Sequence, residues 1–87
     1  MATLFIPPQM RDLSGGAESL TAHGGTLSEV LRALEGAHPG LGERIAPDGC
    51  LASGLAVSID GAMTARGLLA PVKAASEIHI LPAIGGG

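Results

Sequence analysis

The sequence predicts a two-layer α+β domain in which a mixed sheet of four or five strands packs against one main helix. Two observations favour this class. Several segments alternate apolar and polar residues with the period of a strand, and one segment carries apolar residues at the spacing of an amphipathic helix. The predicted order is β-β-α-β-β-β, and a chain of 87 residues is expected to form one domain.

The first two strands are predicted to form a hairpin. Residues 2–8 alternate, with Leu4 and Ile6 on one face and Phe5 on the other. A proline pair ends this strand because proline has no N–H to donate to a ladder. After a Gly-Gly turn signal, residues 17–22 are predicted to return as the second strand.

The helix has the clearest local pattern in the chain. Residues Thr26 to Glu29 form a capping box, in which the Thr26 side chain accepts from the Glu29 N–H and Glu29 reaches back to the Thr26 N–H. The helix is predicted over residues 27–37, and residues 39–45 are predicted to add a short helical turn at the edge of the core. Its apolar stripe at i, i+3, i+4 and i+7 is Leu27, Val30, Leu31 and Leu34.

The second half of the chain supplies the remaining strands. Residues 55–60 alternate, the Asp60-Gly61 pair is a strong hairpin signal, and residues 62–66 are predicted to be the short return strand. Residues 67–76 connect to the last strand, residues 77–81. The apolar residues of this part that are expected to face the core are Leu68, Leu69, Val72, Ile78 and Ile80.

This order of elements is typical of the β-grasp fold, in which the first and last strands lie side by side at the centre of the sheet and one helix covers one face. Residues 1–82 are expected to form the domain. Pro82 is expected to stop regular pairing, so residues 83–87 are predicted to leave the domain as a flexible tail that ends in Gly86-Gly87.

Composition argues against several classes of partner. The formal net charge is −3 with 5 basic residues and no basic cluster, which gives nucleic-acid binding little electrostatic support. Phe5 is the only aromatic residue other than histidine, so no platform for stacking bases is expected. No apolar run approaches the roughly 20 residues of a membrane span, and no signal peptide is visible. The protein is therefore expected to be cytoplasmic and to bind neither nucleic acid nor membrane.

Side chains that carry chemistry are sparse. Cys50 has no second cysteine for a disulfide or for a metal site of the CxxC type. The three histidines lack the spacing of metal ligands, and the serines lack the context of a nucleophile elbow. No catalytic residue, metal site or bound cofactor is expected, and Arg11 and Arg44 are expected to be ordinary surface residues.

Five stretches together resemble one known group of proteins. They are Ile6-Pro7-Pro8 with Arg11, Leu13 and Gly15-Gly16; Gly25-Thr26-Leu27 with Glu29-Val30-Leu31; Leu34-Glu35 with His38-Pro39-Gly40-Leu41 and Arg44; Val57-Ser58-Ile59-Asp60-Gly61; and Ile78-His79-Ile80-Leu81-Pro82-Ala83-Ile84 ahead of Gly86-Gly87. They resemble the ubiquitin-like sulfur carriers of the ThiS/MoaD type. The first three look more like the carriers of the cysteine-synthesis and general thiolation branch.

The resemblance implies a function for the C-terminal glycines. A partner, an E1-like adenylyltransferase, would activate the Gly87 carboxylate with ATP. A sulfur donor, usually a persulfide enzyme, would then displace AMP and leave a thiocarboxylate. That group would donate sulfur to an accepting synthase that makes cysteine, thiolated tRNA or a thio-metabolite. The carrier would be a co-substrate and not an enzyme.

The resemblance also implies how the partner would engage the chain. Gly85, Gly86 and Gly87 would thread into the partner, and Gly86 and Gly87 would lie extended in a channel too narrow for side chains. The partner is expected to dock on the outer face of the sheet beside the tail, where Phe5 and Leu81 would point. Together with these two residues, the expected docking set includes Pro82 and Ile84.

The sequence departs from the family pattern at three places, one of which is the strand segment 62–65, which has little of the expected polarity. The turn before the last strand is often Asp-Gly-Asp and is here Ala74-Ala75-Ser76, so it is predicted to be less acidic and less tightly turned. The residue before the terminal glycine pair is commonly small but not glycine, and here it is Gly85, which makes the tail more flexible than usual.

Four other functions remain open from the sequence. The chain could be the small subunit of a molybdopterin synthase, or a carrier for thiamin. It could be a ubiquitin-like modifier joined to lysines through Gly87. It could also be a β-grasp interaction domain whose glycines are only a frayed end.

Overall fold

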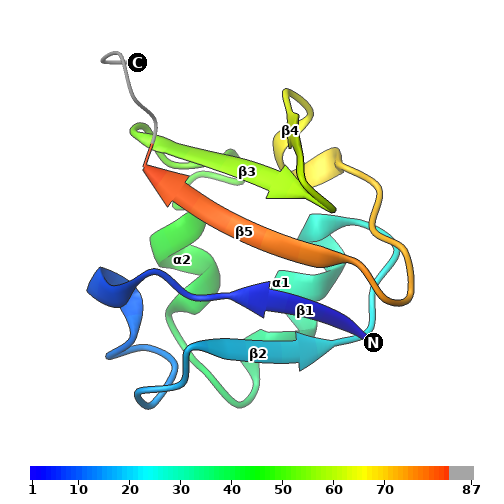
Figure 1. Cartoon of the computed structure of the whole chain (residues 1–87). Helices are drawn as coiled ribbons and strands as arrows, with labels where there is room; N and C mark the ends of the chain where they lie inside the picture. Colours follow the sequence, from blue (N-terminus) through cyan, green and yellow to red (C-terminus); the bar gives the residue numbers. More distant parts are fainter. Residues whose placement is uncertain (83–87) are drawn as a thin grey trace.

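The computed structural model describes residues 1–82. The strands are β1 (Ala2–Phe5), β2 (Ser19–Ala22), β3 (Leu55–Ile59), β4 (Ala62–Thr64) and β5 (Glu77–Pro82). The helices are α1 (Leu27–Glu35) and α2 (Leu41–Ile45), and two short 3-10 helices are η1 (Pro8–Met10) and η2 (Gly67–Leu69). The strands form one sheet in the order β2-β1-β5-β3-β4, and α1 and α2 lie on one face of it (Figure 1). The predicted β-grasp fold is confirmed.

The two ends of the described chain pair at the centre of the sheet. β1 runs parallel to β5, and Leu4 lies opposite Ile78 in the register. β2 flanks β1 in antiparallel pairing, as the predicted hairpin requires, and β3 flanks β5, which is also antiparallel. Because successive residues of a strand face opposite sides of the sheet, this register places Leu4, Ile78 and Ile80 on the helix face, where all are buried.

One core fills the space between the sheet and the helices. The α1 stripe contributes four buried residues, as predicted. α2 was predicted to lie at the edge of the core. It lies deeper than that, because Leu41 and Ile45 are both 0% exposed. The prediction for Leu69 is wrong: its side chain is 72% exposed, since η2 turns it outward. The buried members of this hydrophobic core cluster are Ala2, Leu4, Ile6, Met10, Ala22, Leu27, Val30, Leu31, Leu34, Leu41, Ile45, Val57, Val72, Ile78 and Ile80.

The N-terminus of α1 has one half of the predicted capping box. The Glu29 N–H donates to Thr26 Oγ1 at 3.2 Å, as expected for the N-cap. The reciprocal bond differs, because Glu29 Oε1 accepts from the Gly25 N–H at 2.8 Å and not from Thr26. The Glu29 side chain therefore closes the turn at Gly25, one residue earlier than predicted, and holds Gly24-Gly25 against the helix.

The C-terminus of α1 comes two residues earlier than predicted, at Glu35. The amides of Ala37 and His38 both donate to Leu34 O, which ends the regular ladder. The Glu35 carboxylate then accepts from the Gly40 N–H at 2.8 Å and the Gly42 N–H at 3.3 Å. These two bonds fasten the start of α2 to the end of α1.

The turn between β3 and β4 anchors the start of β5. Asp60 and Gly61 both have positive φ, as a two-residue hairpin turn of type I′ requires. Asp60 Oδ1 accepts from the Glu77 N–H at 2.9 Å, and Asp60 Oδ2 accepts from Ser76 Oγ at 2.8 Å. These hydrogen bonds lower the pKa of the Asp60 carboxyl, the bond from Glu77 most and the bond from Ser76 next.

The turn before β5 is closed by hydrogen bonds. The Ser76 N–H donates to Lys73 O at 3.1 Å, which closes a β-turn, and the Lys73 N–H donates to Ser76 Oγ at 2.9 Å. Ser76 is 2% exposed. The loop is less acidic than in the family pattern, yet the carboxylate of Asp60 reaches it from the neighbouring hairpin and keeps it ordered.

Gly24 lies where the chain passes closest to α1. A Cβ at this position would come within 2.7 Å of the Val30 backbone nitrogen and 3.0 Å of the Glu29 carbonyl carbon. Backbone atoms of a helix cannot move aside cheaply, so only glycine fits. At Gly36, by contrast, a Cβ would meet nothing within 4 Å, and the backbone is already helical.

We predict that Gly24→Ala and Gly36→Ala change stability in opposite directions. Gly24→Ala should lower the free energy of unfolding by roughly 1–3 kcal/mol through the clash with α1. Gly36→Ala should raise it by about 0.4–1 kcal/mol, because alanine restricts the unfolded chain and fits the folded one. Urea denaturation of both variants measures these changes. Equal effects at the two positions would contradict the argument.

We predict that Asp60→Asn removes part of the acid sensitivity of the fold. The folded pKa of Asp60 lies below the unfolded value, so the carboxylate stabilises the fold above the ordinary aspartate range. That contribution is lost as pH falls through the folded pKa. Asparagine tolerates the positive φ but carries no charge, so the variant should be less stable at pH 7 and should lose less stability between pH 7 and pH 3.

Urea midpoints at the two pH values test this prediction. Asp48→Asn is the matched control, because Asp48 is exposed in a loop and carries the same change of charge. If Asp60→Asn and Asp48→Asn reduce the acid sensitivity equally, Asp60 has no special role.

Candidate functional site

The candidate site lies where β1 and β5 separate. Their last pair is Phe5 with His79. The chain after β1 continues through Pro7 and Pro8, and proline has no N–H with which to extend the ladder. β5 continues to Pro82 while η1 turns away, as the left side of Figure 1 shows. A groove of about 520 Å³ opens between them.

An aromatic pair forms part of this groove. The rings of Phe5 and His79 stack with centroids 4.3 Å apart and an interplanar angle of 3°. Both residues point to the outer face of the sheet, away from the helices, and both are half-buried. The sequence predicted that each would face outward, but the contact between them depends on the β1–β5 register, which no local pattern specifies.

The predicted docking residues converge on the same groove. Leu81 is 38% exposed and Pro82 is exposed, and both line the groove with Phe5. An exposed leucine beside a stacked aromatic pair is apolar area available to another chain. Ile84, Gly85, Gly86 and Gly87, which the sequence predicts for docking and threading, lie outside the described residues.

Two charged residues at the groove were not singled out from the sequence as part of a site. Arg11 is half-buried, and its Nε–H donates to Ile6 O at 3.2 Å. Glu18, at the start of the turn into β2, is exposed and lines the same groove. The groove therefore combines apolar and aromatic area with one cation and one carboxylate. Aromatic residues and arginine are enriched at protein interfaces.

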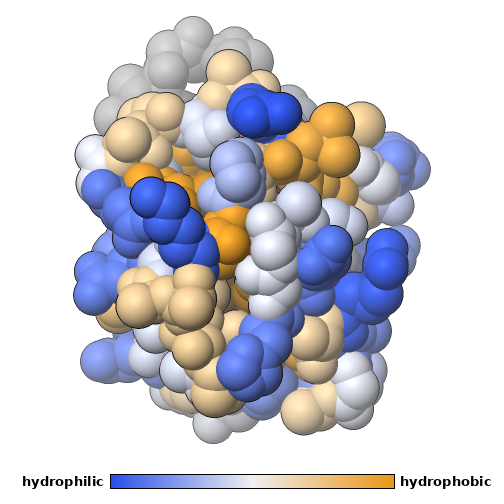
Figure 2. Space-filling model, turned by 90° about the vertical axis from the view of Figure 1, so that its right-hand side faces the viewer, coloured by the Kyte–Doolittle hydropathy of each residue, from blue (hydrophilic) through white to orange (hydrophobic). Residues whose placement is uncertain are grey.

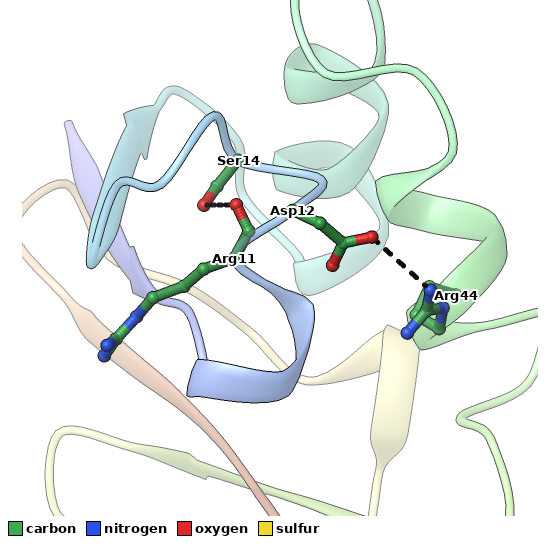
Figure 3. A network of polar contacts seen from close by, with 4 residues as sticks. All are labelled: Arg11, Asp12, Ser14 and Arg44. Atoms are coloured by element: carbon green, nitrogen blue, oxygen red, sulfur yellow. Dashed lines mark hydrogen bonds and ion pairs between the residues drawn. The ribbon is translucent and has the colours of Figure 1, made fainter.

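The loop between η1 and β2 positions Arg11. Ser14 is 3% exposed, and its Oγ lies 2.7 Å from Ala17 O and 3.2 Å from Arg11 O, to which it donates. Asp12, which follows Arg11 in the sequence, points away from the Arg11 side chain. Asp12 Oδ2 lies 3.9 Å from Arg44 Nη2, so Arg44 has an ion-pair partner within the chain. Figure 3 shows the Arg11 side chain pointing away from Asp12 and Arg44.

A second apolar region lies away from this groove. The side of the molecule that carries β4 and η2 has hydrophobic surface gathered in its upper half (Figure 2). Met63 is 63% exposed and Leu69 is 72% exposed. Cys50 is exposed with a free thiol and lines a groove of about 530 Å³ together with Arg66 and Leu69. This region provides exposed apolar residues for comparison with those beside β5.

The described residues contain neither a cluster of three or more potential metal ligands among His, Cys, Asp and Glu nor a candidate membrane-spanning helix. In residues 1–82 the groove beside β5 is therefore the candidate site on the grounds of its shape, its exposed apolar area and its charges. Its arrangement suits recognition of another protein segment.

Comparison with known proteins gives one family and several solved structures. The model of the ThiS family matches residues 5–87. One chain in the crystal structure of the Amycolatopsis orientalis BexX/CysO complex is 31% identical and has a TM-score of 0.88, with 100% of each chain covered. Mycobacterium tuberculosis CysO is 28% identical with a TM-score of 0.86, covering 97% of this chain and 100% of that one.

A third similar structure is that of a modifier protein. SAMP1, a small archaeal modifier protein from Haloferax volcanii, is 27% identical with a TM-score of 0.72, and the match covers 99% of this chain and 98% of that one. No match was found among curated proteins. The family match over nearly the whole chain agrees with the resemblance seen in the sequence. The chain belongs to the ThiS family and has the ubiquitin-like β-grasp fold of the ThiS/MoaD-type sulfur carriers.

Proposed function

We propose that this protein carries sulfur on its C-terminal carboxylate. One observation supports this function most directly. β5, the central strand, ends at Pro82 beside an exposed groove that fits a protein partner. The residues that follow in the sequence are Ala83, Ile84 and three glycines. A carrier needs its reactive C-terminus close to the surface on which the partner docks.

The chemistry takes place at Gly87. Its carboxylate oxygen attacks the α-phosphorus of ATP, which is bound by an E1-like adenylyltransferase, and pyrophosphate leaves. A persulfide sulfur from a donor enzyme attacks the acyl-adenylate carbon, and AMP leaves. A thiol then cleaves the S–S bond and releases the thiocarboxylate. The partners supply the catalytic residues and the ATP site, and this chain supplies the reacting carboxylate.

The similarity to CysO supports a pathway within the cysteine-synthesis and thiolation branch. Both CysO structures match over 97% or more of this chain. The accepting enzyme would then be a synthase that makes cysteine, thiolated tRNA or a thio-metabolite. Activity with the large subunit of a molybdopterin synthase, or with thiamin-forming enzymes, would assign the chain to another branch.

A ubiquitin-like modifier is the second candidate function, because SAMP1 of Haloferax volcanii is also similar in fold and sequence. The two functions share the adenylation step and differ in the acceptor. Intact mass after incubation with adenylyltransferase, ATP and sulfide separates them. Exchange of one oxygen for sulfur supports a carrier, and conjugates of higher mass in lysate support a modifier.

We predict that Gly87→Ala lowers thiocarboxylate formation by about 100-fold, the loss expected when a reacting atom is displaced by about 1 Å. The added methyl group would meet the walls of the partner's channel. The fold of residues 1–82 should be unaffected. Mass spectrometry of the loaded carrier measures the product. Gly85→Ala is the matched control and should load nearly normally, because the family commonly has a small side chain there. Full loading of Gly87→Ala would contradict the threading argument.

We predict that Leu81→Ser weakens docking to the adenylyltransferase. The variant should raise the KM for the carrier by about tenfold, which corresponds to roughly 1.4 kcal/mol of lost binding. Leu69→Ser is the control, because Leu69 is more exposed but lies away from the groove. Pyrophosphate release at varied carrier concentration gives both KM values. A larger effect at Leu69 would place the docking surface on the side of β4.

A further inference from the structure

We propose that two copies of this protein associate through the open edge of β4, the side of the strand that faces away from β3. The two strands pair in antiparallel fashion about a two-fold axis and join the two sheets into one. In this dimer Met63 lies opposite Met63 of the other copy, and Asp60 lies near Arg66 of the other copy. The proposal goes beyond the proposed function and does not depend on it. Because β3 separates β4 from β5, the groove beside β5 stays open in the dimer.

The open edge of β4 presents backbone groups that can bond to another strand. β4 is the last strand of the sheet, so one side of it has no neighbouring strand in residues 1–82. Ala62 pairs with Ile59 across the two-residue turn, and Thr64 pairs with Val57. A two-residue hairpin closes on a hydrogen-bonded pair, and such pairs alternate with non-hydrogen-bonded ones along an antiparallel ladder. The N–H and C=O of Met63, which lies between Ala62 and Thr64, therefore point to the open side.

The usual protection of a sheet edge is incomplete at β4. Natural edge strands are kept short, or they carry charged residues or proline that oppose pairing with another chain. β4 is short, at 3 residues, but residues 61–65 include neither a charged residue nor a proline. At the opposite edge of the sheet, the exposed residues of β2 are Ser19 and Thr21, which are polar. Of the two edges, β4 therefore favours an apolar strand partner.

Exposed apolar side chains accompany this edge. Met63 lies opposite Ser58 on β3, and the neighbouring Val57 is buried on the helix face, so Met63 faces the outer side of the sheet. Its side chain is 63% exposed, and in the dimer it lies beside its counterpart. Leu69 is 72% exposed and lines a groove with Thr64, on the side of the molecule where hydrophobic surface gathers (Figure 2). Contact between two copies removes part of this apolar area from water, which is favourable.

The charges that flank β4 favour a second copy as the occupant of the edge. When Met63 lies on the two-fold axis, position 60 of one copy faces position 66 of the other. Asp60 and Arg66 have opposite charges and both are exposed, so the axis generates two pairs of opposite charge. In residues 1–82 the ion pair within the chain joins Arg44 to Asp12, so Arg66 has no carboxylate partner there. Each Asp60 carboxylate oxygen accepts one hydrogen bond in its own chain and has a second lone pair for the arginine.

Sedimentation equilibrium of the 87-residue chain tests the association. The weight-average mass should rise from the 8.6 kDa of one chain toward twice that value as the protein concentration approaches the millimolar range. Arg66→Glu should raise the Kd of the dimer by about tenfold, because two exposed pairs of opposite charge become two pairs of like charge. Met63→Lys should abolish association, because two ammonium groups would lie side by side.

Arg44→Glu is the matched control for Arg66→Glu. It makes the same change of charge on α2, away from β4, and the exposed pair of Arg44 with Asp12 contributes little to stability. Its Kd should equal that of the native chain.

NMR spectroscopy of a mixture of labelled and unlabelled chains tests the register. Ala62 and Thr64 of opposite copies form a non-hydrogen-bonded pair in the dimer, and the two residues of such a pair come closest to each other. An intermolecular nuclear Overhauser contact is therefore expected between the α proton of Ala62 and that of Thr64. The Met63 amide should exchange with solvent more slowly as the protein concentration rises.

Three results would overturn the proposal. One is the mass of a single chain at every concentration. Another is an equal Kd for Arg66→Glu and Arg44→Glu. The third is association in which the intermolecular contacts involve Phe5 and Leu81, because the copies would then meet at the groove beside β5. Since no adenylyltransferase is present in these measurements, none of the three bears on thiocarboxylate formation.

Discussion

The parallel pairing of β1 with β5 is the constraint on which the rest of the structure depends. β1–β2 and β3–β4 are local hairpins, and a two-stranded hairpin is marginal in water by itself. β5 joins them, because it pairs with β1 on one side and with β3 on the other. This pairing brings together residues separated by most of the chain, so its loop-closure entropy must be offset by burial. Leu4 and Ile78, opposite each other and both 0% exposed, provide that burial at the centre of the sheet.

The same pairing creates the candidate site where it stops. Burial of Ile78 and Ile80 on the helix face obliges His79 and Leu81 to face outward, because strand residues alternate. Phe5 is the last residue of β1 and lies beside His79, which gives the aromatic stack. Proline at position 7 then ends the ladder and opens the groove. The groove and the core are therefore two consequences of one register.

Local patterns predicted the parts of the fold that local physics determines. The helix N-terminus at Thr26 and the turn at Asp60-Gly61 depend on residues within four positions of each other, and both are present. The Phe5–His79 stack and the bond from Ser76 to Asp60 join residues far apart in sequence, so no periodicity indicates them. Leu69 was predicted to face the core because it is apolar. Its side chain is exposed instead, because the short 3-10 helix η2 in the connecting segment turns it outward.

The two ends of β5 are held in different ways, and this asymmetry suits a strand that presents its C-terminus. At the start, Asp60 binds Ser76 and the Glu77 amide, so two turns and the strand are joined by one carboxylate. At the other end, Pro82 lies opposite Leu55 on β3, while the β1 side has no paired residue after Phe5. Ser76 and Asp60 thus anchor the start of β5. The side of its C-terminal end that has no β1 partner remains available for contacts with a chain that occupies the groove. A partner must bind a carrier near its C-terminus. Hydrogen bonds that hold the opposite end of the same strand suit this function, because binding near the C-terminus then does not disturb the core.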